Sequence, residues 1–420
     1  MCFPRLAPAL LALALLPVPV QAQITVVEGD GARLTLGGYV RTLTGVHDQG
    51  FEIPDSAAIP ATPRRSGFHG QVIRLKWQLE GGPGTAGSGT SWKLNVHNRL
   101  QTRVSSAGNV AQSVGFGVSA VPERLVDLES VIMEEPGLRV WHDLDRLSLT
   151  VYTEIADVTL GRQAITWGVS GIFPVADLWA QFSPFELDTE EKPGIDAIRV
   201  LSYPAPALEL DFVLADRGAA ENLSFGVRGT YGLSGADVWA GAGKFWREVL
   251  AMGGVTLLLD EVKLRGEAVL PWDMDAESLA DPRVTLGVDW IRGTLVLTGE
   301  YHLNGIGSGP GGYFGAFQDP RVQRGETYYV GRHYLGGLVS WSPDRENRLN
   351  LVLNALTNLE DPSAALTPLA SYDVGQATRV SLGGLISGGD RPSFDTLPPR
   401  IPSEFGAYGT LGFVQLSVYF

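Results

Sequence analysis

The chain has 420 residues, of which 44% are hydrophobic and 19% charged, and its net charge is −14. This acidic balance argues against nucleic acid as a partner, because phosphate binding needs a basic surface. Cys2 is the only cysteine, so disulfides and thiolate metal sites are excluded once the first residues are removed. We expect neither a metal nor any other cofactor.

The first 22 residues are typical of a secretory signal peptide. Arg5 is followed by an apolar stretch from Leu6 to Val20, and Val20-Gln21-Ala22 fits a small-x-Ala cleavage site. The stretch is interrupted by prolines and is too short to cross a membrane comfortably. We therefore expect residues 1–22 to be cleaved during export and residues 23–420 to form the mature protein.

From Ala32 onward, the chain repeats segments in which apolar and polar residues alternate. Between residues 71 and 80, for example, Ile73 and Leu75 alternate with Arg74 and Lys76. A period of two residues is the signature of a β-strand with one apolar face. The chain shows no convincing helical period and no linker, so a single all-β domain is expected.

Short and long breaks between these segments take turns. Short breaks lie at residues 204–207, 232–235 and 344–347, and long ones at residues 47–65, 104–144, 169–193, 304–326 and 388–405. This alternation is typical of a transmembrane antiparallel β-barrel with short periplasmic turns and long outer loops. The pattern predicts about 18 strands, with 16 as the alternative, because the strands near residues 238–245 and 249–260 are poorly delimited.

A barrel of about 18 strands is too wide for its own side chains to fill the interior. The apolar faces would then face membrane lipid and the polar faces would line water. The last strand carries its apolar residues on one face: Val414, Leu416, Val418 and Phe420. It resembles the C-terminal strand of bacterial outer-membrane proteins, whose final aromatic residue is recognised by the barrel-assembly machinery. The resemblance implies an outer-membrane location, with the lipid and that machinery as partners.

The loop at residues 169–193 is far longer than an ordinary hairpin turn. It carries large apolar residues and then acidic ones: Ile172, Phe173, Trp179, Phe182 and Phe185, followed by Glu186, Asp188, Glu190 and Glu191. Apolar side chains gain free energy when they leave water. We therefore expect this loop to fold into the lumen and to set the narrowest point of a pore.

The loop and its flanking strands contain a recognisable set of motifs. They read LGRQAITWG at residues 160–168, FPVADL at 173–178, SPF at 183–185 and GIDAIRV at 194–200. This set resembles a group of porin-like outer-membrane β-barrel proteins of Gram-negative bacteria with a Gly-Arg-Gln…Trp-Gly strand and a Gly-x-Asp-x-x-Arg strand. The resemblance implies fold and location, and it implies no reaction or substrate.

Charged residues on the flanking strands break the simple alternation. Arg162 shares the parity of the apolar Leu160, and a lipid-facing arginine would cost about 2–4 kcal/mol. We expect a bulge near Gly161 to turn Arg162 inward, where it would clamp an acid of the loop. Such residues could contact solute or merely pin the loop. The predicted constriction comprises Asp177, Trp179, Phe185, Glu186, Asp188, Glu190, Arg162, Asp196 and Arg199.

The inward faces of two early strands are basic. They carry Arg74, Lys76, Lys93, His97, Arg99 and Arg103. A basic wall opposite the acidic half of the loop would set up a transverse field across a narrow pore, which orients dipolar solutes. The alternative is ordinary solvated decoration of the lumen.

We predict an outer-membrane, porin-like channel for the passive passage of small solutes, and a homo-oligomer is possible. The alternative is a non-conducting barrel that acts as a structural or surface partner-binding protein. The third hypothesis is an outer-membrane hydrolase, although the six histidines form no HxH or HExxH motif. We therefore do not expect an enzyme.

Overall fold

The computed structural model describes residues 23–29, 31–52, 63–82, 89–107, 122–186, 190–396 and 398–420. The predicted signal peptide, residues 1–22, lies outside the described residues. No helix in the described part of the chain is long and apolar enough to cross a membrane.

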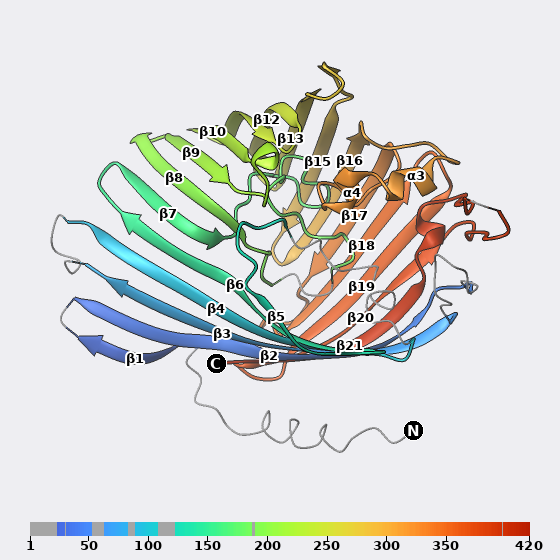
Figure 1. Cartoon of the computed structure of the whole chain (residues 1–420), viewed down its shortest axis with the longest axis horizontal. Helices are drawn as coiled ribbons and strands as arrows, with labels where there is room; N and C mark the ends of the chain where they lie inside the picture. The colour runs from blue at the N-terminus through green and yellow to red at the C-terminus, as the bar shows by residue number, and fades with distance from the viewer. Residues whose placement is uncertain are drawn as a thin grey trace.

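The described chain forms a closed barrel of 18 antiparallel strands (Figure 1). In order around the wall these are β2 (Ala32–Asp48), β3 (Arg65–Gly81), β4 (Ser91–Ser105), β6 (Leu138–Tyr152), β7 (Ala156–Gln163), β8 (Ile195–Ala205), β9 (Leu208–Ala215), β10 (Ser224–Leu233), β11 (Ala236–Phe245), β12 (Glu248–Leu259), β13 (Val262–Asp273), β15 (Arg283–Arg292), β16 (Leu295–Asn304), β17 (His333–Trp341), β18 (Leu349–Asn358), β19 (Ser363–Asp373), β20 (Thr378–Gly388) and β21 (Thr410–Tyr419). The predicted fold class and the strand number of 18 are confirmed.

The barrel closes where β21 pairs with β2. Tyr39 to Asp48 of β2 pair with β21, whereas the first residues of β2 pair with the short strand β1 (Ile24–Gly29). The last residue continues the closure, because Phe420 and Gly38 exchange two backbone hydrogen bonds of 2.8 and 3.0 Å. The C-terminal strand is therefore the seam that completes the ladder.

Short elements supplement the wall at other places. Strand β5 (Glu129–Glu135) pairs with the first half of β6, residues 138–143, and β14 (Ser278–Leu279) pairs with β13. Among the described residues, the helical segments are η1 (Ala220–Asn222), α3 (Tyr313–Phe317), α4 (Pro320–Gln323) and η2 (Phe405–Ala407). All four lie in connections at the end of the barrel that carries the long loops.

The alternation along the strands separates an apolar outer face from a polar inner face. On β16, Leu297 is 36% exposed, whereas Glu300 is 2% exposed. Large apolar side chains on other strands are exposed in the same way, including Phe212, Phe225, Leu286, Leu382 and Ile386. Such a surface is stable next to lipid and costly next to water, which is the arrangement of a transmembrane barrel.

The two strands that were hard to delimit in the sequence are joined by a tight turn. Strand β11 ends at Phe245 and β12 begins at Glu248, and Trp246 between them has a positive φ of 48°. This connection lies at the end of the barrel where most connections are long. Its brevity explains why the alternation alone left 16 strands open as a count.

Candidate functional site

The inward loop, defined here as residues 164–194, joins β7 to β8 and passes through the middle of the barrel (Figure 1). Its first half is held to the β13–β16 wall by two carboxylates. Glu300 of β16 accepts hydrogen bonds of 2.7–3.0 Å from the backbone N–H groups of residues 171–173. Glu267 of β13 accepts one of 2.7 Å from the N–H of Val169. These contacts place the loop inside the barrel.

The charge of Glu300 is compensated by a buried arginine. Arg265 of β13 lies 2.9 Å from Glu300 and 2.7 Å from Asp289, and all three side chains are buried. Hydrogen bonds to an ionised acceptor are about twice as strong as neutral ones. The alternation predicted that Glu300 faces inward, but only the fold shows that it binds loop backbone instead of lining water.

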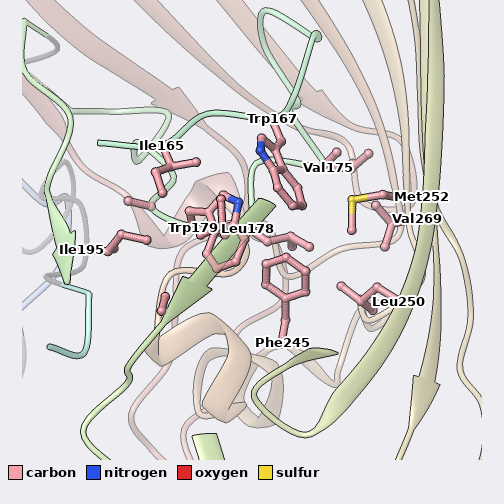
Figure 2. Close-up of a cluster of buried hydrophobic side chains, with 14 of the residues drawn as sticks. Ile165, Trp167, Val175, Leu178, Trp179, Ile195, Phe245, Leu250, Met252 and Val269 are labelled. Atoms are coloured by element: carbon pink, nitrogen blue, oxygen red, sulfur yellow. The ribbon is translucent and has the colours of Figure 1, made fainter. Parts of the chain in front are cut away.

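The first apolar cluster anchors the loop to the β9–β13 wall (Figure 2). Trp167 and Trp179 of the loop meet edge to face with ring centroids 5.1 Å apart, and Trp179 lies 4.5 Å from Phe245 of β11. Trp167 and Trp179 are 0% and 1% exposed. Burying a large side chain is worth about 1.5–3 kcal/mol, so these tryptophans are strong anchors. Trp179 was predicted for the constriction and lies in this packed layer.

The second apolar cluster anchors the loop on the other side, against β17–β21. Phe173 stacks on His302 of β16 with centroids 5.0 Å apart. Phe185 packs against Tyr408 and Phe405 from the connection before β21. The loop is therefore fastened to two parts of the wall, and it crosses the lumen between them.

The acidic end of the loop contacts basic side chains of the barrel directly. Glu190 pairs with Arg41 of β2, and Glu191 pairs with Lys76 of β3. Asp188 lies outside the described residues. The Glu191–Lys76 pair joins the acidic end of the loop to the basic wall, whereas Arg41 was not among the predicted residues of that wall.

Asp177 pairs with a lysine of its own loop. Its partner is Lys192, which also donates a hydrogen bond of 2.9 Å to Thr166. Burial raises the pKa of Asp177, although the charge of Lys192 opposes the shift. Burial likewise lowers the pKa of Lys192, against the opposing effect of Asp177. Lys192 therefore ties the end of the loop to its middle, through Asp177, and to its beginning, through Thr166.

The expected role of Arg162 is wrong. Arg162 is 1% exposed and binds Asp196 of β8 at 2.8 and 2.9 Å, instead of an acid of the inward loop. The pairing of β7 shows no register shift near Gly161, which lies opposite Ser148. The irregularity lies in the pairing of β6 with β4, where Asp145 is the extra residue. Gly161 has a φ of 103° and packs against the backbone of Leu147, a place that no side chain could occupy.

Two carbonyl oxygens and a third strand complete the surroundings of Arg162. It donates to the carbonyl oxygens of Leu144 and Val126, while Asp196 accepts from the N–H of Val126. Arg162 and Asp196 thus connect β7 and β8 to β6 and to Val126, at the place where β6 and β7 separate. Of the two roles left open, pinning of local structure fits these contacts.

Arg199 holds the start of the inward loop through one shared carboxylate. It binds Asp211 of β9 at 2.7 and 2.9 Å, and Trp167 donates to the same carboxylate at 2.8 Å. The Trp-Gly and Asp-x-x-Arg motifs are therefore joined in space through Asp211. A single inward-facing acid at the right distance positions the first buried tryptophan of the loop.

The basic wall contains aspartates that sequence reasoning missed. Arg74 binds Asp145 at 2.8 Å and Arg99 binds Asp143 at 2.7 Å. The extra residue at Asp145 lets β6 turn both Asp145 and Arg146 toward the interior. The charge of the wall is therefore largely balanced. No feature of the period-2 pattern predicts a bulge at this residue.

The remaining members of the basic wall lie on β4. Arg103 stacks on Trp141, with its guanidinium carbon 5.1 Å from the ring centroid. In the backbone register of β3 and β4, His97 lies opposite Lys76 and Lys93 lies opposite Glu80. Among the described residues, no group of three His, Cys, Asp or Glu side chains is arranged to hold a metal ion.

Comparisons with known proteins bear on the fold. No protein-family model matches the chain, and no curated protein does. Among solved structures, OccK5 (OpdH) of Pseudomonas aeruginosa has a TM-score of 0.55 at 8% identity, over 92% of this chain and 97% of that one. OccAB4 of Acinetobacter baumannii has a TM-score of 0.55 at 8% identity, over 94% and 99%.

A third similar structure is OccD3 (OpdP) of Pseudomonas aeruginosa. Its TM-score is 0.53 at 11% identity, over 95% of this chain and 93% of that one. Likeness at such low identity shows a shared fold. The barrel fold is therefore shared with solved structures.

Proposed function

We propose that this protein is a porin-like channel of the bacterial outer membrane, through which small solutes pass passively. One observation carries the proposal: the inward loop is fastened to two parts of a wide barrel with an apolar outer face and crosses the lumen between them. The barrels whose fold it shares are outer-membrane porins, which supports the same location. The motif resemblance supports that location independently.

Single-channel recording tests the proposal. The purified full-length barrel, reconstituted in a planar bilayer, should show discrete conductance steps. Removing residues 171–188 should raise the conductance severalfold, because it removes the material that narrows the lumen while the wall strands remain paired. Heat-modifiable migration on gels would verify that the shortened barrel is folded. An unchanged conductance in a folded deletion variant would place the constriction elsewhere.

The alternative is a barrel that does not conduct and instead displays its long loops to a partner. The complete burial of Trp167 and Trp179 favours it, because such packing leaves little freedom for the loop to move. Absence of conductance steps in the full-length barrel, together with steps in the deletion variant, would support this alternative.

A further inference from the structure

A cavity of about 770 Å³ lies beside the acidic end of the inward loop. Its wall is formed by inward-facing residues of β2, β19, β20 and β21, near the end of the barrel with short turns. This volume falls in the range of pockets that hold small organic molecules, about 300–1,000 Å³. The cavity adjoins the second apolar cluster, because Leu369 and Phe413 belong to both.

The strand register arranges the cavity wall in rows. One row contains Asp373, Arg379, Ser417 and Arg41, and the next contains Ser371, Ser381 and Gln415. A third row is apolar, with Leu369, Gly383 and Phe413 in register. The wall therefore offers two rows of hydrogen-bonding groups beside one apolar row.

The charges in this wall are compensated. Arg379 binds Asp373 at 2.7 and 3.0 Å, and Arg41 binds Glu190. Glu186 adds one further carboxylate to the lining. The lining thus holds three carboxylates and two guanidinium groups, so an incoming anion meets a net negative charge and no unpaired arginine. This balance disfavours carboxylate solutes.

The uncharged polar groups of the wall use only part of their hydrogen-bonding capacity within the protein. Gln415 makes a single weak contact of 3.5 Å to Ser417, and its carbonyl oxygen is buried without a partner among the described residues. Ser371 and Ser381 share one hydrogen bond of 2.9 Å, which leaves their remaining donor and acceptor capacity free. Amides and hydroxyls beside an apolar surface match a molecule with hydroxyl groups on its edges and C–H groups on its faces.

We infer that this cavity is a binding site for neutral, polyhydroxylated solutes of the size of a mono- or disaccharide. The inference rests on the proposed channel function, because it names the solute class that the channel would pass. Paired charges, unfilled amide and hydroxyl groups and an adjoining apolar row all fit such a solute. A site built to bond hydroxyl groups rejects analogues that lack them.

Calorimetric titration of the folded, full-length barrel with maltose tests the inference. The detergent should be an amine oxide, because a maltoside detergent would occupy the site itself. Maltose should bind saturably, whereas sodium acetate and glycine should bind much more weakly. Replacing Gln415 by Leu together with Ser371→Ala and Ser381→Ala should weaken maltose binding by about tenfold or more, because each net hydrogen bond is worth roughly two- to tenfold.

Controls separate this inference from the proposed function. Thr256→Val removes one polar side chain from β12, outside the cavity wall, and should leave maltose binding unchanged. If the triple variant does not fold, Ser371→Ala alone should still weaken binding. A conducting barrel that binds acetate better than maltose, or does not bind maltose, would overturn the inference and leave the channel in place. Maltose binding to a barrel without conductance would support the site and refute the channel.

Discussion

At the scale of single residues, buried carboxylates hold the interior together. Glu300 is 2% exposed and bonds three consecutive backbone N–H groups of the inward loop. An ionised carboxylate suits this task, because it offers about four acceptor sites and each bond is charge-assisted. The role of Glu300 is therefore to fix the position of the loop, and not to line the water of the lumen.

Replacing Glu300 by Gln should weaken this attachment. We expect a loss of about 1.5–3 kcal/mol, because the charge is removed and one amide group faces the N–H donors. The midpoint of heat-induced unfolding on gels should fall, and channel recordings should show more frequent current fluctuations. Glu346→Gln, at a 75% exposed side chain, is the matched control. An unfolding midpoint equal to that of the control would contradict an anchoring role.

A second carboxylate joins the long loops at the mouth. Glu404 is fully buried and accepts hydrogen bonds from the hydroxyl of Tyr334, the amide of Asn358 and the N–H of Val330. The other titratable groups around it, which are Asp361, Tyr313, Tyr329, Tyr334 and Tyr408, are all acids. Burial raises the pKa of Glu404 to about 7. The protonated form is therefore favoured by the folded barrel.

The sign of this shift predicts lower stability at higher pH. The pKa of Glu404 is higher in the folded than in the unfolded state, so its contribution is complete below pH about 4.5 and is lost as pH rises through about 7. The loss should amount to about 3 kcal/mol at most. Urea unfolding at pH 5 and pH 8 would measure it, and Glu404→Gln should flatten the difference. If the stability of the Glu404→Gln variant depended on pH as that of the parent does, the loss of stability would arise from other groups.

At the scale of elements, the inward loop and β21 have different tasks. The loop narrows the lumen, and its motif residues mostly position its ends, as Arg199 does through Asp211. Strand β21 closes the ladder, with Val414 53% exposed on its outer face. Phe420 extends this closure by bonding to Gly38.

Deleting Phe420 should impair assembly in cells. The deletion removes two backbone hydrogen bonds at the seam and also the terminal aromatic residue that the predicted assembly signal requires. The deletion variant should accumulate in the periplasm or be degraded, which fractionation and immunoblotting would show. Tyr372→Ala, which removes an exposed aromatic from β19, is the control. Normal outer-membrane levels of the Phe420 deletion variant would refute the signal.

At the scale of the whole molecule, one alternation decides which face meets lipid. Leu382 and Arg379 lie on the same strand but on opposite faces: Leu382 is 62% exposed on the outer face, while Arg379 lines the inner cavity. The apolar belt is stable in hydrocarbon, where a charged side chain at mid-depth would cost about 2–4 kcal/mol. The charged side chains of the strands are therefore favourable only on the inner face of the barrel.

Cysteine labelling in proteoliposomes tests this orientation. The only natural cysteine is Cys2, within the predicted signal peptide. A water-soluble maleimide should label Arg379→Cys rapidly and Leu382→Cys slowly, because the latter faces the bilayer. A lipid-soluble maleimide should reverse the ranking. Fast labelling of Leu382→Cys by the water-soluble reagent would invert the barrel and refute the transmembrane arrangement.

The sequence by itself determined the barrel, a count of about 18 strands with 16 as the alternative, the lipid-facing side and the inward course of the loop. These properties follow from local periodicity, loop length and the free energy of apolar burial, all of which can be read along one chain. It also placed the acidic end of the loop opposite basic strands, and one predicted residue of these strands, Lys76, pairs with Glu191.

Only the tertiary structure decided the specific partners. Arg162 binds Asp196 instead of a loop acid, because these two residues lie opposite each other in the register of β7 and β8. Glu300 binds loop backbone, and Glu404 gathers groups from three separate segments. Such contacts depend on register shifts of one residue and on contacts between segments far apart in the chain. Neither can be predicted from the alternation of apolar and polar residues along a strand.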